Sequence, residues 1–135
     1  MDLKINASYL PQTDPDASLA FYRDVLGFEV RNDVGYEGLR WITVGPVGQP
    51  DTSIVLHPPQ ATPGITDAER DMILDLVTKG TFGINLGTAD VDVTIAKIEG
   101  AGAEIVQEPI DQPYGIRDAA FRDPAGNEIR LQQHA

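Results

Sequence analysis

Few side chains in this sequence are of the kinds that carry out chemistry. The 135 residues include two histidines and no cysteine, which excludes disulfides, thiolate catalysis and zinc-finger sites. His57 ends an alternating segment that begins at Ser53, and it is the candidate general base. A general base needs a partner that orients its ring, and the neighbouring residues in the chain do not identify one.

Arg130 and Trp41 are better suited to binding than to catalysis. Arg130 stands between Ile129 and Leu131 in an alternating segment, so its guanidinium faces away from the apolar side of a strand. It must find water, a carboxylate of the other half of the chain, or an anionic group of a ligand. Trp41 offers a flat apolar surface with one donor, which suits either an aromatic ligand or ordinary core packing.

Turn residues and apolar periodicity predict the elements that carry these side chains. In the first half they predict a strand at residues 3–12, a helix that Asp14 caps and Gly27 ends, and strands at 28–33, 39–44 and 52–57. In the second half they predict a strand at 82–86, a helix that Asp90 caps, and strands at 104–108, 115–122 and 127–132.

A proline-rich linker from residue 58 to residue 64 joins the two halves. It leads into a short helix from Thr66, with Glu69 placed three residues later as in a capping box. This helix can pack as a plain surface helix or lie over a binding site as a lid, and the sequence does not decide between the two.

The two halves repeat the same plan. Ile54 and Leu56 recur as Ile129 and Leu131 at an offset of 75 residues, and the capping Asp14 recurs as Asp90. The sequence therefore predicts an α+β fold of two pseudo-symmetric β-α-β-β-β modules in a single domain spanning 1–135. Module 1 covers about residues 1–58, the linker and short helix 59–79, and module 2 about 80–135.

Charge and hydropathy narrow the class of partner. The net charge of −11 argues against nucleic acid and weakly favours a cationic small molecule. No stretch approaches the roughly 20 apolar residues that span a bilayer, and the N-terminus has no basic cluster followed by an apolar run. We expect a cytoplasmic protein without a membrane partner.

Three stretches resemble the vicinal oxygen chelate superfamily, which includes glyoxalase I, extradiol dioxygenases and bleomycin-resistance proteins. They are residues 14–28, 40–44 and 121–127. The resemblance implies that the strands of both modules curve into a cup with the helices outside, and that the protein forms a homodimer.

Metal-dependent members of this superfamily carry His, Gln or Glu at four positions of the cup. By resemblance these positions are Ala7, Val55, Gly83 and Arg130 in this sequence. Three of them lack donor atoms and the fourth is a permanent cation. We therefore expect the fold without the metal-dependent activities, and no cofactor.

The leading hypothesis is a metal-free, bleomycin-resistance-like protein that binds an aromatic or cationic small molecule, which favours a binding protein over an enzyme. The alternative is a lyase, isomerase or dioxygenase-like enzyme that uses His57 and Arg130 at an atypical site, and a third possibility is a regulatory or assembly module. The predicted ligand-binding residues are Tyr9, Trp41, Val55, His57, Asn85, Arg117, Arg130 and Gln132.

Overall fold

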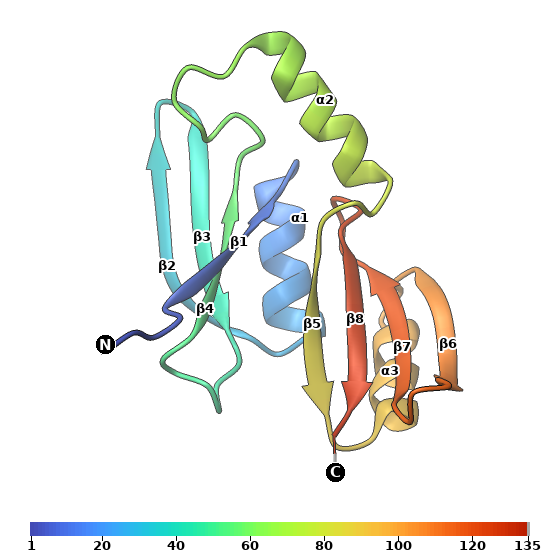
Figure 1. The fold of residues 1–135 in the computed structure, drawn as a ribbon. Coiled ribbons are helices and arrows are strands. Elements are labelled where there is room, and N and C mark those ends of the chain that lie inside the picture. Colours follow the sequence, from blue (N-terminus) through green and yellow to red (C-terminus); the bar gives the residue numbers. More distant parts are fainter. Residues whose placement is uncertain (135) are drawn as a thin grey trace. The chain divides into compact units, whose positions relative to one another are not determined.

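The computed structural model describes residues 1–134, and the chain divides into two compact units. Unit 1 is Met1–Asp75 and unit 2 begins at Leu76, so the boundary falls inside helix α2 (Asp67–Thr78). Each unit has one four-stranded sheet (Figure 1). No helix of residues 1–134 is long and apolar enough to cross a membrane.

Unit 1 has the predicted β-α-β-β-β order. Its strands are β1 (Ala7–Pro11), β2 (Glu29–Tyr36), β3 (Leu39–Gly45) and β4 (Ser53–His57), in the spatial order β1-β4-β3-β2. Strand β1 runs parallel to β4, and the other two pairs are antiparallel. β1 begins four residues later than predicted, because its neighbour β4 begins at Ser53, opposite Ala7.

The helix of unit 1 begins as predicted and continues in an unexpected form. The side chain of Asp14 accepts a hydrogen bond from the amide of Ala17, and Pro15 is the first residue of α1 (Pro15–Ala20). A π-helical turn, η1 (Phe21–Val25), follows directly, and Gly27 ends the segment with a positive φ of 72°.

Unit 2 repeats this topology, which confirms the predicted repeat. Its strands are β5 (Gly83–Thr88), β6 (Ile105–Asp111), β7 (Arg117–Arg122) and β8 (Glu128–Gln133), in the spatial order β5-β8-β7-β6. Asp90 caps α3 (Val91–Gly100) by accepting from the amide of Val93, as predicted. In the turn before β8, the carboxylate of Asp123 accepts from three successive backbone amides.

Each sheet has one face against a helix and one face turned away from it. α1 packs against β3, and α3 packs against β6, β7 and β8. The side chains that face the helices are the predicted core residues: Ile42, Val44, Ile54 and Leu56 in unit 1, and Ile129 and Leu131 in unit 2. Alternation along the strands therefore places Trp41, Val55 and His57 on the face opposite α1, and Arg130 on the face opposite α3.

Candidate functional site

Three aromatic rings gather on the face opposite α1. Trp41 lies on β3, His57 on β4 and Tyr9 on β1, which are three successive strands of the sheet. The β3–β4 register pairs Ile42 with Leu56, so Trp41 and His57 occupy the next opposing positions. The ring centroids of Tyr9 and His57 are 6.2 Å apart. The planes of these two rings are tilted by 57° to each other, so each aromatic ring of this face offers its own apolar surface to a ligand.

His57 is oriented by the backbone. Its Nδ1 lies 2.7 Å from the carbonyl oxygen of Pro58. Since a carbonyl can only accept, Nδ1 carries the proton in this contact and Nε2 of the neutral ring holds the lone pair. The structure thus supplies the orienting group that the sequence could not identify, and it is a carbonyl rather than a carboxylate.

A pocket of about 600 Å³ lies beside Trp41, entirely within unit 1. Strands β2 and β3 contribute Tyr36, Leu39 and Trp41 to its lining, and the linker from Gln60 to Thr66 forms another wall. The first residues of α2 complete it with two charged side chains, Asp67 and Arg70. We refer to it as the Trp41 pocket. Its volume falls within the range of about 300–1,000 Å³ that is typical of small-molecule sites.

The start of α2 is held in place by the predicted capping box. The amide of Glu69 donates to the Thr66 hydroxyl at 3.1 Å, and the amide of Thr66 donates to the Glu69 carboxylate at 3.0 Å. These bonds hold the pKa of Glu69 below its ordinary value. The capping box therefore determines where the linker ends and where the charged residues of the first turn project.

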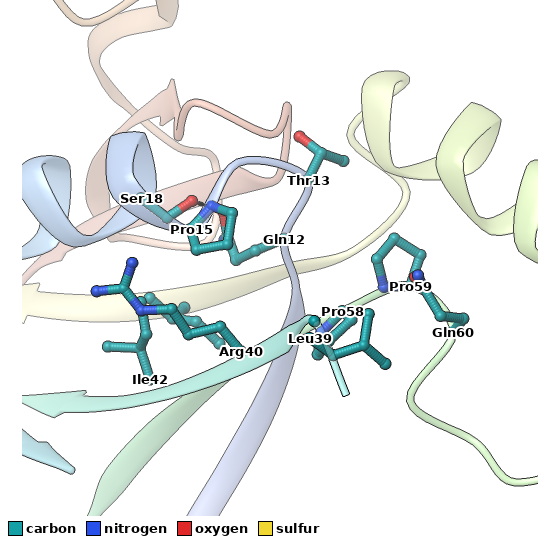
Figure 2. A pocket seen from close by; sticks show the side chains of 12 residues that line it. Gln12, Thr13, Pro15, Ser18, Leu39, Arg40, Ile42, Pro58, Pro59 and Gln60 are labelled. Carbon is teal, nitrogen blue, oxygen red and sulfur yellow. Dashed lines mark hydrogen bonds between the residues drawn. The ribbon is translucent and has the colours of Figure 1, made fainter. Parts of the chain in front are cut away.

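A second pocket lies on the other side of β3, next to the start of α1 (Figure 2). Its volume is about 150 Å³, which is below the range of typical small-molecule sites. Three of its polar side chains are already engaged, because Ser18 donates to Gln12 and Arg40 is ion-paired with Asp16 and Asp33. The second pocket is therefore the weaker candidate.

The face opposite α3 carries a polar network around Arg130. Its Nη1 donates to Gln107 Oε1 and Asp118 Oδ2, both at 3.1 Å, and its Nη2 lies 3.6 Å from Glu128 Oε2. Asp118 is fully buried and also accepts from Gln107 and Gln112. Burial by itself raises the pKa of Asp118, but the hydrogen bonds from the two glutamines and Arg130 outweigh burial and hold that pKa below its ordinary value.

Of the alternatives considered for Arg130, the structure shows the ion pair. Both carboxylates belong to unit 2, however, whereas that alternative placed the partner in the other half of the chain. Two carboxylates face one guanidinium, so the positive charge of Arg130 is already neutralised. Asp118 was missed in the sequence, and its alternation with Ala120 along β7 is the signal that places it on the same face as Arg130.

The structure distributes the eight predicted ligand-binding residues among three places. Those in unit 1, Tyr9, Trp41, Val55 and His57, share the face opposite α1. In unit 2, Asn85 pairs with Arg130 in the sheet, and Gln132 pairs with Asp118. Arg117 stands apart, since it binds Asp92 of α3 at 2.8 Å and Asp111 at 3.3 Å. Their contacts with a ligand stay predictions.

The four positions that the resemblance assigned to metal ligands carry no side chain suited to a divalent cation. Ala7 and Val55 have no donor atom, and Arg130 is a cation already bound to carboxylates. At Gly83 a side chain has no room, because a Cβ there would lie 2.0 Å from the carbonyl oxygen of Glu128. Nowhere in residues 1–134 do three His, Cys, Asp or Glu side chains gather as metal ligands would.

The sequence and the fold of this chain are similar to those of several known proteins. The sequence profile described as "Glyoxalase/Bleomycin resistance protein/Dioxygenase superfamily" matches residues 4–131. The crystal structure of UcmS2 is 35% identical, covers 99% of this chain and 100% of its own, and superposes with a TM-score of 0.89. TnmS3, an antibiotic binding protein from Streptomyces sp. CB03234, is 28% identical over 99% of this chain and 98% of its own, with a TM-score of 0.76. The uncharacterized protein YurT of Bacillus subtilis (strain 168) is 28% identical over 97% of this chain and 99% of its own.

Proposed function

Because the chain belongs to the glyoxalase/bleomycin resistance protein/dioxygenase superfamily, we propose that it binds a planar aromatic small molecule in the Trp41 pocket, without a metal. The observation that carries this proposal is the pocket itself, about 600 Å³ in volume with Trp41 in its lining and two more aromatic rings on the same face. The similarity to TnmS3, an antibiotic binding protein, supports a ligand of the antibiotic class.

The charges around the pocket favour a neutral or cationic guest. Glu37 and Asp67 line it together with Arg70, so the lining carries one more negative than positive charge. The net charge of −11 has the same sign. An indole face also attracts cations, so a cationic aromatic molecule fits both features.

The absence of a metal is part of the proposal and rests on two residues. Gly83 has no room for a ligating side chain, and Arg130 places a guanidinium where a metal ligand stands in related proteins. Elemental analysis of the purified protein is expected to find no stoichiometric Zn, Ni, Mn or Fe. One tightly held metal per protomer would contradict this part.

The homodimer and the cytoplasmic location implied by the sequence also remain proposals. Light scattering of the purified protein tests the homodimer.

Trp41 provides the direct test of the binding function. Titration with a panel of antibiotics, aromatic metabolites and glutathione adducts is expected to change the fluorescence of this single tryptophan. For a ligand found in this way, Trp41→Ala is expected to weaken binding by roughly tenfold or more in calorimetry, because one stacking contact is worth about 1–3 kcal/mol. Trp41→Phe should retain much of the affinity.

Tyr114→Ala serves as the matched control, since Tyr114 is an exposed aromatic residue of unit 2 that does not line the Trp41 pocket. It is expected to bind as the unaltered protein does. If Trp41→Ala binds equally well, or if no compound of the panel changes the fluorescence, the proposed site loses its support.

One observation favours an enzyme as the second candidate. The Pro58 carbonyl holds His57 with Nε2 available as a base. The enzyme hypothesis also used Arg130 to bind an anionic group. That role has less support, because Asp118 and Glu128 neutralise the charge of Arg130. Turnover of the hemithioacetal of methylglyoxal that is lost in His57→Ala would decide for the lyase-type enzyme over the binding protein.

A further inference from the structure

Arg70 is the basic residue of the Trp41 pocket, and its hydrogen-bonding capacity is underused. Among residues 1–134 its Nε is buried without a hydrogen-bond partner. Its guanidinium contacts the neighbouring Asp71, with Nη2 at 3.2 Å from Oδ1. A buried N–H without an acceptor costs free energy, so Arg70 gains from any group that brings an acceptor to it.

The surroundings of Arg70 limit what that group can be. Glu37 and Asp67 line the same pocket, and Asp71 already contacts the guanidinium. The two carboxylates of the lining and the one at the guanidinium disfavour a fully anionic ligand group. A neutral oxygen acceptor, such as a ring carbonyl, takes the hydrogen bond without this repulsion.

We infer that Arg70 donates a hydrogen bond to a neutral oxygen of the ligand, so that the Trp41 pocket selects planar aromatic molecules that carry a carbonyl. This inference rests on the proposed function and assigns Arg70 as a specificity-determining residue. Arg70 lines the pocket and its side chain is 39% exposed, whereas its Nε is buried in the free protein, so the proposed bond requires the side chain to turn its Nε edge toward the ligand. A ligand without an acceptor leaves Arg70 Nε unpaired, as it is in the free protein, so it gains no hydrogen bond from this residue.

Arg23 offers a matched control for Arg70. It also contacts the aspartate that follows it in the chain, with Nε at 2.9 Å from Asp24 Oδ1 and Nη2 at 3.1 Å from Asp24 Oδ2. It does not line the Trp41 pocket, and its Nε is paired. Arg23→Ala therefore removes the same side chain and a comparable ion pair without touching the proposed site.

The test uses two planar probes that differ in one group, 9-fluorenone with its ring carbonyl and fluorene with a methylene. The 135-residue chain is titrated with each, and the single Trp41 indole N–H resonance reports the dissociation constant by nuclear magnetic resonance. We expect fluorenone to bind roughly tenfold more tightly than fluorene, which is the effect of one hydrogen bond to a charged donor. We also expect fluorenone, and not fluorene, to shift the Arg70 Nε–H resonance.

The variants separate the possible outcomes. Arg70→Ala is expected to bind both probes with equal affinity, whereas Arg23→Ala keeps the preference for fluorenone. Equal binding of the two probes by the unaltered protein, or an equal loss of both in Arg70→Ala, overturns the inference and leaves the proposed function standing. If neither probe shifts the Trp41 indole resonance, the pocket does not accept planar aromatic molecules and the proposed function fails as well.

Discussion

The backbone of Gly83 passes close to the carbonyl oxygen of Glu128 on the neighbouring strand β8. A Cβ at position 83 would lie 2.0 Å from that oxygen, which is well inside van der Waals contact. At the residue scale, the packing of these two strands therefore requires a glycine at position 83.

This close approach predicts a cost for any side chain at position 83. Gly83→Ala is expected to lower the free energy of unfolding by about 1–3 kcal/mol, because the two backbones must separate. Gly48→Ala is the control, since a Cβ there meets no atom within 4 Å. Urea unfolding measures the free energy of unfolding of both variants. Equal midpoints would show that the backbones of β5 and β8 are not in close contact at Gly83.

Helix α2 shows how one element shapes the Trp41 pocket. Its first turn carries Asp67 and Arg70 into the pocket lining, and the capping box of Thr66 and Glu69 determines where that turn begins. At the scale of elements, the hydroxyl of one threonine therefore supports the placement of two charged side chains.

Removing that hydroxyl is expected to loosen the start of α2. Thr66→Ala should cost about 1 kcal/mol and weaken protection of the first-turn amides against hydrogen exchange by roughly fivefold. Ligand affinity should fall with it, because Arg70 lies in that turn. Thr62→Ala makes the same substitution at another residue of the pocket lining, without removing a capping bond, and should leave exchange unchanged. Unchanged exchange in both variants would show that the capping box does not stabilise the helix.

At the scale of the whole molecule, the excess of acidic residues makes stability depend on pH. Hydrogen bonds from arginines lower the pKa of Asp33 and Asp92, and the network around Arg130 lowers that of Asp118. A carboxyl whose pKa is lower in the folded state contributes stability above its unfolded pKa, and this stability is lost as the pH falls through the folded value. Glu108 acts in the opposite sense, since burial and the charge of Glu99 raise its pKa.

The fully buried Asp118 is expected to dominate this acid sensitivity. Asp118→Asn should cost roughly 3 kcal/mol at pH 7, because Arg130 and two glutamines lose a charged partner. The difference from the unaltered protein should shrink as the pH falls below about 4, the ordinary pKa of an aspartate, because the unfolded chain binds a proton there while the folded carboxyl of Asp118, with its lowered pKa, resists protonation. Denaturant unfolding at a series of pH values measures the effect.

The exposed pair of Arg23 and Asp24 is the control for the buried one. Asp24→Asn is expected to leave stability almost unchanged at any pH, because solvent screens a surface ion pair. If Asp118→Asn and Asp24→Asn lose the same free energy of unfolding with the same pH dependence, the burial of Asp118 does not cause the acid sensitivity.

The sequence by itself determined the features that depend on neighbours along the chain. Alternation identified the core side of β4 and β8, and Asp14, Gly27 and Asp90 marked the helix ends where the structure has them. These signals are local, because a cap or a strand face is set by residues one to four positions away. The repeat followed from them, and with it the α+β fold.

Only the tertiary structure decided which distant groups meet. The partners of Arg130 depend on the register that sets Ala120 opposite it, and this register places Asp118 within reach. The Trp41 pocket likewise requires the linker to return over strands β2 and β3, which no local pattern specifies. The contacts of Arg130 with Asp118 and Gln107 join residues 12 and 23 positions apart in the chain, so the packing of strands, rather than local propensity, selects them.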